Sequence, residues 1–166
     1  MAASQCSVVR LAGGRRLGLR RWPGEGDPLV LLHGLLDSAD GWSDLARHTR
    51  RPFLAFDLAG FGRSDHPERP EISAYAGDVV EAFESLNVER WRFAGPVAAL
   101  WGEHDALVPP AHARGLRAAA PQATVQVWPG MGHHPQRERP RQLAHFVEWH
   151  AAAAERRSSP WPALAA

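Results

Sequence analysis

Three stretches of the chain place a side chain or a glycine where chemistry could be done. Leu31-Leu32-His33-Gly34 ends an apolar run, and a glycine there lets backbone N–H groups approach a developing oxyanion. Asp105 follows another apolar run, where a carboxylate could orient an imidazole and stabilise its charged form. His133 follows Gly132, and histidine suits general-base work because it titrates near neutrality. These residue types predict an oxyanion site, an acid and a base.

Each of these residues also has a structural alternative. Gly34 could simply end a strand, and Asp105 could cap the turn that precedes Val108-Pro109. The neighbouring His134 is an alternative to His133 as the base. A metal site is disfavoured, because the sequence has no His-Glu-x-x-His helix and no paired cysteines.

The glycine-rich segment 57–64 is interpreted as a structural loop whose glycines permit unusual backbone angles. It is not a phosphate loop, because that motif needs a lysine and the chain has none. Ser64 stands between Arg63 and Asp65 and so lacks the glycine spacing of a nucleophile elbow. The segment therefore supplies no nucleophile.

Composition narrows the class of protein. The chain has 166 residues and a hydrophobic content of 45%, which are enough for one globular domain with a core. Its net charge of +1 gives no indication that it binds nucleic acid or a membrane. We expect no signal peptide and no membrane span, which would need about 20 apolar residues, and therefore predict a cytoplasmic protein. All basic residues are arginine, which suggests a GC-rich gene and a bacterial source.

Apolar runs and amphipathic segments alternate along the chain, which favours an α/β sheet. Runs without polar alternation predict strands buried on both faces of a parallel sheet. Ser73 is the predicted N-cap of the longest helix before the middle of the chain, and residues 155–166 are predicted to be a disordered tail. The predicted strands are 8–11, 17–22, 28–32, 52–56, 89–94, 97–101 and 124–128, and the predicted helices are 40–46, 73–86, 111–120 and 140–154.

Taken in this order, these pieces resemble the α/β-hydrolase fold family over roughly residues 16–149. The resemblance implies a mostly parallel sheet flanked by helices, and small ester-like substrates handled without a cofactor. It further implies that Gly34 and the backbone of Leu35 form part of the oxyanion hole. By the same resemblance Asp105 would be the triad acid and His133 the base, in the chain order that the family uses.

The sequence departs from the family at residues 95 and 96. In the family, a strand like Trp91–Gly95 leads into an elbow of the type Gly-His-Ser-x-Gly that carries the nucleophile. Here Gly95 is followed by Pro96, and the next run resembles the strand before the acid. The resemblance therefore implies an internal deletion that removes the elbow strand-helix unit and the lid, and leaves residues 1–154 as one incomplete domain.

Because the elbow is missing, we predict that the chain has no nucleophile. It would then be inactive as a serine-type hydrolase. Two alternatives stay open: weak hydrolysis of small esters by water activated by His133, or a pseudoenzyme that binds a ligand or partner. Whether the parent nucleophile was serine or aspartate is not decided. An open sheet edge would also favour self-association.

Overall fold

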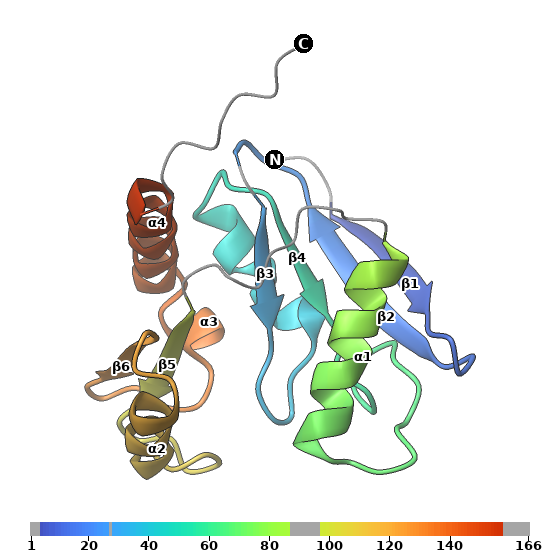
Figure 1. Cartoon of the computed structure of the whole chain (residues 1–166). Helices are drawn as coiled ribbons and strands as arrows, with labels where there is room; N and C mark the ends of the chain where they lie inside the picture. The colour runs from blue at the N-terminus through green and yellow to red at the C-terminus, as the bar shows by residue number, and fades with distance from the viewer. Residues whose placement is uncertain (1–3, 27, 87–96, 158–166) are drawn as a thin grey trace. The chain divides into compact units, whose positions relative to one another are not determined.

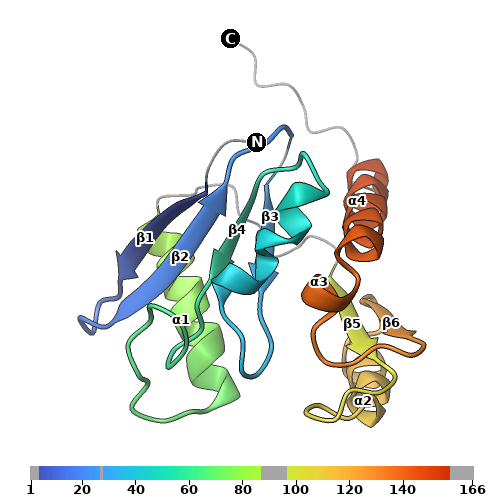
Figure 2. The same ribbon diagram turned by 180° about the vertical axis from the view of Figure 1, so that it is seen from behind.

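The computed structural model describes residues 4–26, 28–86 and 97–157. They belong to two compact units, Met1–Arg92 and Phe93–Ala166, which are described separately below (Figures 1 and 2). The predicted strand at 89–94 and the junction at 95 and 96 lie outside the described residues. The single incomplete domain over 1–154 stays a prediction.

The first unit is built on a four-stranded sheet in the order β1-β2-β4-β3. β1 (Gln5–Arg10) and β2 (Arg16–Trp22) form the predicted antiparallel hairpin. β4 (Phe53–Phe56) is antiparallel to β2, and β3 (Leu29–Leu32) is parallel to β4. The sheet is therefore mixed, and the parallel pair ends just before His33 on one strand and Asp57 on the other.

Alternate side chains of β4 reach two separate hydrophobic clusters, which explains why the whole strand is buried. Leu54 and Phe56 pack with α1 (Ile72–Ser85), whereas Phe53 and Ala55 pack beside the 3-10 helices η1 (Ala39–Ser43) and η2 (Leu45–Arg47). The helix and the 3-10 turns thus cover opposite faces of the sheet (Figures 1 and 2). A strand covered on both faces is the arrangement predicted for residues 52–56.

The prediction of two buried faces is wrong for the strand at 28–32. β3 is only partly buried, and Leu32 at its end is 48% exposed. Within the described residues β3 pairs with β4 alone, so one of its edges has no strand beside it there. The apolar run predicted burial on both faces, but within the described residues β3 lies at an edge of the sheet and stays partly exposed.

Two local predictions also need correction. The helix α1 begins at Ile72 with Glu71 at the N-cap position, so Ser73 lies inside the first turn and is exposed. The segment predicted as one short helix at 40–46 forms two 3-10 helices, η1 and η2, which are separated at Asp44.

The second unit is a two-stranded parallel sheet with helices. β5 (Ala98–Gly102) leads through α2 (Ala111–Ala119) to β6 (Thr124–Trp128), close to the predicted ranges. A short α3 (Pro135–Glu138) precedes α4 (Pro140–Arg157), whose Phe146 contacts Trp128 edge-on at 5.9 Å between ring centroids. α4 continues to Arg157, three residues into the predicted tail, and residues 158–166 lie outside the described part.

Two glycines offer a matched test of these elements. Gly77 is exposed inside α1, and a Cβ added there would meet no atom within 4 Å. We expect Gly77→Ala to raise the free energy of unfolding by about 0.5–1 kcal/mol, because alanine loses less backbone entropy in a helix. A shift of the urea midpoint would measure this change.

The control is Gly14, which is equally uncrowded but has a φ of +82° in the hairpin turn. Gly14→Ala should lower the free energy of unfolding by about 1 kcal/mol, because an L side chain disfavours that angle. Equal shifts for both variants would contradict the assignment of the helix and the turn.

Candidate functional site

In the second unit, Asp105 and His133 lie after neighbouring parallel strands and meet side chain to side chain. Asp105 follows β5, His133 follows β6, and His133 Nδ1 lies 2.8 Å from Asp105 Oδ2. Both side chains are largely buried. Because the carboxylate accepts the proton on Nδ1, the basic lone pair of a neutral His133 ring lies on Nε2. This is the tautomer that a general base needs.

Asp105 is held as a carboxylate by donors on both oxygens. Burial acts to raise its pKa, but three hydrogen bonds outweigh that effect and leave the pKa below its usual range. The donors are the backbone N–H of Val108 at 2.8 Å, His133, and the backbone N–H of Leu107 at 2.9 Å. Asp105 thus has both of the roles considered from the sequence. It caps the following turn with Oδ1 and orients His133 with Oδ2.

The loops that carry the pair pass in close backbone contact. A Cβ on Gly102 would lie 2.0 Å from the carbonyl oxygen of Gly132, so no other residue fits there without movement. Glu138 accepts the backbone N–H of Gly132 at 2.9 Å and that of His134 at 3.1 Å. The sequence did not single out Gly102 or Glu138 for this role. Their contacts fix the backbone on both sides of His133.

The lowered pKa of Asp105 predicts a pH dependence of stability. A carboxyl whose folded pKa is depressed stabilises the fold above its unfolded pKa of about 3.9, and this contribution is lost as the pH falls through the folded pKa. We expect Asp105→Asn to be less stable than the unaltered chain at pH 5–7, with the difference shrinking below about pH 4. Urea midpoints by circular dichroism would measure it. A constant difference down to pH 3 would show that Asp105 acts by packing alone.

In the first unit, the buried ring of His33 connects the loop after β3 to the loop after β4 by hydrogen bonds. Its Nε2 accepts the backbone N–H of Leu58 at 2.9 Å, so the ring proton sits on Nδ1, 2.8 Å from the carbonyl oxygen of Gly34. The ring also meets Phe61 edge-on. His33 therefore holds the backbone around Gly34, one of the two predicted oxyanion residues.

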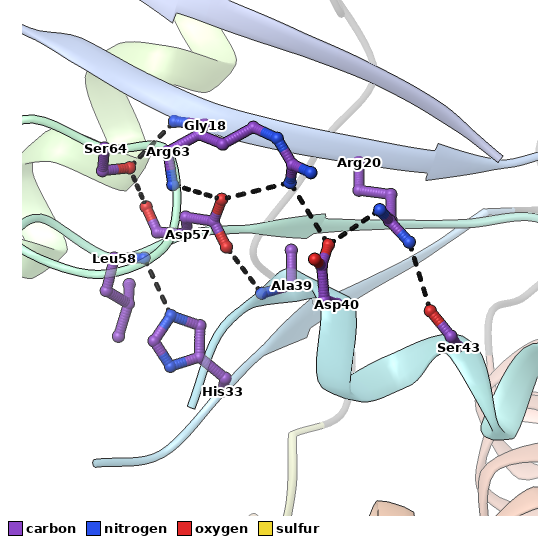
Figure 3. Close-up of polar contacts among 10 residues, drawn as sticks. All are labelled: Gly18, Arg20, His33, Ala39, Asp40, Ser43, Asp57, Leu58, Arg63 and Ser64. Carbon is purple, nitrogen blue, oxygen red and sulfur yellow. Dashed lines mark hydrogen bonds and ion pairs between the residues drawn. The ribbon is translucent and has the colours of Figure 1, made fainter. Parts of the chain in front are cut away.

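Asp57 fixes the same region from the end of β4 (Figure 3). It is 1% exposed, and its carboxylate accepts the backbone N–H groups of Ala39 at 2.6 Å and Arg63 at 2.9 Å. Gly62, with a φ of +53°, leaves room for it, since a Cβ there would lie 2.3 Å from the Asp57 carboxyl carbon. The segment 57–64 is thus a structural loop in its contacts, as interpreted from the sequence.

Ser64 is part of this loop's framework. Its hydroxyl donates to the carbonyl oxygen of Asp57 and accepts the backbone N–H of Gly18, the latter at 2.8 Å (Figure 3). A hydroxyl used in this way is occupied in backbone contacts on both sides. This placement agrees with the absence of an elbow around Ser64 in the sequence.

Leu35 and Leu36 follow Gly34 and are exposed, with 48% and 67% of their surface accessible. Leu36 has a φ of +60°, which is an uncommon angle for a residue with a side chain. The predicted oxyanion residues thus lie on a turn with backbone strain in the first unit, whereas the acid and base pair belongs to the second.

The described residues contain neither a cluster of metal ligands nor a helix that could span a membrane. No group of three or more His, Cys, Asp or Glu side chains in that part of the chain could hold a metal ion. None of the described helices has the length and apolar character of a membrane span.

Comparisons with known proteins identify the relationship. A sequence profile for the alpha/beta hydrolase fold matches residues 27–91. The human 1-acylglycerol-3-phosphate O-acyltransferase ABHD5 is 44% identical over 71 residues, which are 40% of this chain and 19% of that protein. A haloalkane dehalogenase of Mycolicibacterium paratuberculosis is 43% identical over 76 residues, 40% of this chain and 24% of that protein. The chain thus spans about a fifth to a quarter of the length of these curated relatives.

The similarity to solved structures covers more of the chain than the sequence profile does. The esterase RhEst1 from Rhodococcus sp. ECU1013 superposes with a TM-score of 0.74 at 17% identity, covering 90% of this chain and 99% of that one. At this identity the superposition speaks for the fold alone. Its strand order, its glycine-rich loop after β4 and the superposition together show that the chain has the α/β-hydrolase fold, and residues 27–91 match the profile of that family.

Proposed function

We propose that this chain is an α/β-hydrolase family protein that keeps the acid and base of an ester-hydrolase site but has no nucleophile. In this proposal Asp105 is the acid, His133 the base, and Gly34 with Leu35 the oxyanion residues. The chain is then inactive as a serine-type hydrolase. The observation that carries the proposal is the hydrogen bond of 2.8 Å between His133 and Asp105, set beside a sequence with no elbow for that base to serve.

The whole sequence contains no nucleophile elbow. An elbow needs a nucleophile framed by glycines two residues to either side. In this sequence only Gly14 and Gly18 have that spacing, and the residue between them is Arg16. The second oxyanion N–H of the family also comes from the residue after the nucleophile, so the proposed hole is incomplete as well.

The substrate of the parent enzyme belongs to the small-molecule class, and its bond type stays open. The relatives with matching sequence are named as an acyltransferase and a dehalogenase, whereas a structural neighbour is an esterase. Such a family hosts several chemistries on one fold. We therefore propose an ester-like substrate for the parent, without assigning its nucleophile.

Labelling with a fluorophosphonate tests the proposal. A serine activated by His133 would be labelled to one equivalent and would release p-nitrophenol from an ester in a burst. We expect neither for this chain, whereas a family esterase treated alongside should show both. Stoichiometric labelling that disappears in His133→Ala would overturn the proposed vacancy.

A second candidate function rests on the formed pair itself. A His133 ring oriented by Asp105 could deprotonate a water molecule and hydrolyse reactive esters slowly, since positioned general bases contribute about 10²- to 10⁴-fold. Turnover of p-nitrophenyl acetate without a burst, lost in both His133→Ala and Asp105→Ala, would favour this candidate. Turnover that is equal in the unaltered chain and both variants would exclude it.

A third proposal concerns partners. The expected self-association depends on a sheet edge that is open, and the pseudoenzyme interpretation depends on either such an edge or an apolar cleft. In the described residues β3 has one strand neighbour and a half-exposed Leu32, which is compatible with such an edge. Sedimentation over a range of protein concentrations would test self-association directly. A cytoplasmic location and a bacterial source remain predictions of the sequence.

A further inference from the structure

The segment 129–134 joins β6 to α3 and carries His133, the base of the proposed site. It forms neither helix nor strand, so no ladder of helix or sheet bonds satisfies its backbone N–H and C=O groups. Three charged side chains bind this backbone, those of Glu103, Glu138 and Arg139. Each of them holds a different part of the segment.

The turn directly after β6 is held by Glu103 and Arg139. Oε2 of Glu103 accepts the backbone N–H of Gly130 at 2.9 Å. Nη2 of Arg139 donates to the carbonyl oxygen of Pro129 at 2.9 Å and to that of Gly130 at 3.0 Å. These bonds order the turn, but they are made to residues that are not adjacent to His133.

Glu138 holds the backbone on both sides of His133. Its Oε2 accepts the N–H of Gly132 at 2.9 Å, and its Oε1 accepts the N–H of His134 at 3.1 Å. The backbone N–H of Glu138 also donates to the carbonyl oxygen of His134 at 2.9 Å, so these two residues are bonded in both directions. Because hydrogen bonds to a carboxylate are stronger than neutral ones, this side chain is well suited to fix the orientation of the two peptide groups.

Two neighbouring histidines stand close to the one carboxylate of Asp105. The rings of His133 and His134 meet edge-on, with 4.8 Å between their centroids, and it is His133 that bonds to Asp105. Asp105 is itself held by two backbone N–H groups of the turn that follows it. The orientation of the backbone at 132–134 therefore decides which of the two rings meets the carboxylate.

We infer that Glu138 is a positioning residue that directs the ring of His133, and not that of His134, to Asp105. By holding the peptide groups on both sides of His133, it keeps the proton of the neutral ring on Nδ1. The inference rests on the proposed function, because His133 can act as a base through Nε2 only in this tautomer. Glu138 acts through the backbone of His133.

Nitrogen-15 NMR of the histidine rings in the full chain tests this inference. At about pH 8, where histidine rings are ordinarily neutral, the unaltered chain should show His133 with its proton on Nδ1. A His133→Gln variant identifies this signal among the nine histidines of the chain. In Glu138→Ala we expect the Nδ1–H signature of His133 to be lost, because the ring no longer stays on Asp105. An unchanged signature would overturn the inference.

The matched control is Glu103→Ala. Glu103 and Glu138 are both exposed, and each accepts a backbone N–H of the same segment, but Glu103 bonds to Gly130 instead of the neighbours of His133. Glu103→Ala should therefore keep the Nδ1–H signature. Circular dichroism would verify that both variants are folded. Equal loss of the signature in both would show a general loosening of the segment and would refute a positioning role for Glu138.

Glu138→Gln keeps the test decisive if the alanine variant does not fold. The amide retains one acceptor oxygen and turns a donor toward the second N–H, so a mixture of the two His133 tautomers is expected. The unaltered spectrum in this variant would contradict the inference. Because the measurement needs no turnover, its failure would leave the proposed absence of a nucleophile untouched. Ester turnover with a burst would refute that absence without changing the spectrum.

Discussion

Replacing Asp57 by alanine is expected to lower the free energy of unfolding by at least about 3 kcal/mol, since two charge-assisted hydrogen bonds are lost at about 1.5 kcal/mol each or more. The carboxylate is 1% exposed and accepts the N–H groups of Ala39 and Arg63, so water cannot readily replace it. The loop after β4 and the 3-10 turn at Ala39 would lose their common anchor. Urea unfolding followed by tryptophan fluorescence would measure the change.

Asp40 is the matched control for that experiment because it belongs to the same network (Figure 3). Its carboxylate pairs with Arg20 at 2.8 Å and Arg63 at 3.2 Å but is 50% exposed. Exposed pairs contribute about 0–1 kcal/mol, so Asp40→Ala should shift the urea midpoint only slightly. If the two alanine variants lose the same stability, burial of Asp57 is not what makes it important.

The second large effect is expected at Phe56, whose substitution by alanine should lower the free energy of unfolding by about 3–5 kcal/mol. Phe56 is fully buried between β2, β3 and α1, and it meets Phe83 edge-on at 5.1 Å between ring centroids. Truncation would leave a cavity at the centre of the first hydrophobic cluster. Thermal unfolding by circular dichroism would show a lowered midpoint or a lost transition.

Val80 provides the comparison for Phe56. It lies on α1, the helix that covers this cluster, but its own side chain is 45% exposed. Val80→Ala should change the free energy of unfolding by no more than about 0.5 kcal/mol. A large loss at Val80 with little loss at Phe56 would mean that α1 packs on the sheet by another face.

Local sequence patterns predicted most of the elements because hydrophobic periodicity acts over a few residues. The strands β2 and β4 and the helices α2 and α4 lie close to the predicted ranges, whereas β1 begins three residues before the predicted strand at 8–11. The pattern failed where the neighbour of a strand decides its burial. Leu32 belongs to an apolar run but is half-exposed, since in the described residues β3 has a strand on one side only.

For the candidate site as well, the sequence determined some features and the tertiary structure determined others. The sequence by itself determined that Asp105 and His133 each follow a predicted strand, and that no glycine-framed nucleophile exists. Only the tertiary structure decided that His133, rather than His134, bonds to Asp105, 28 residues earlier in the chain. It also decided that Asp57 is a buried anchor and that Glu138 accepts the backbone N–H groups on both sides of His133. The physical reason is that strand pairing brings distant residues into contact, and a one-dimensional pattern does not encode that distance.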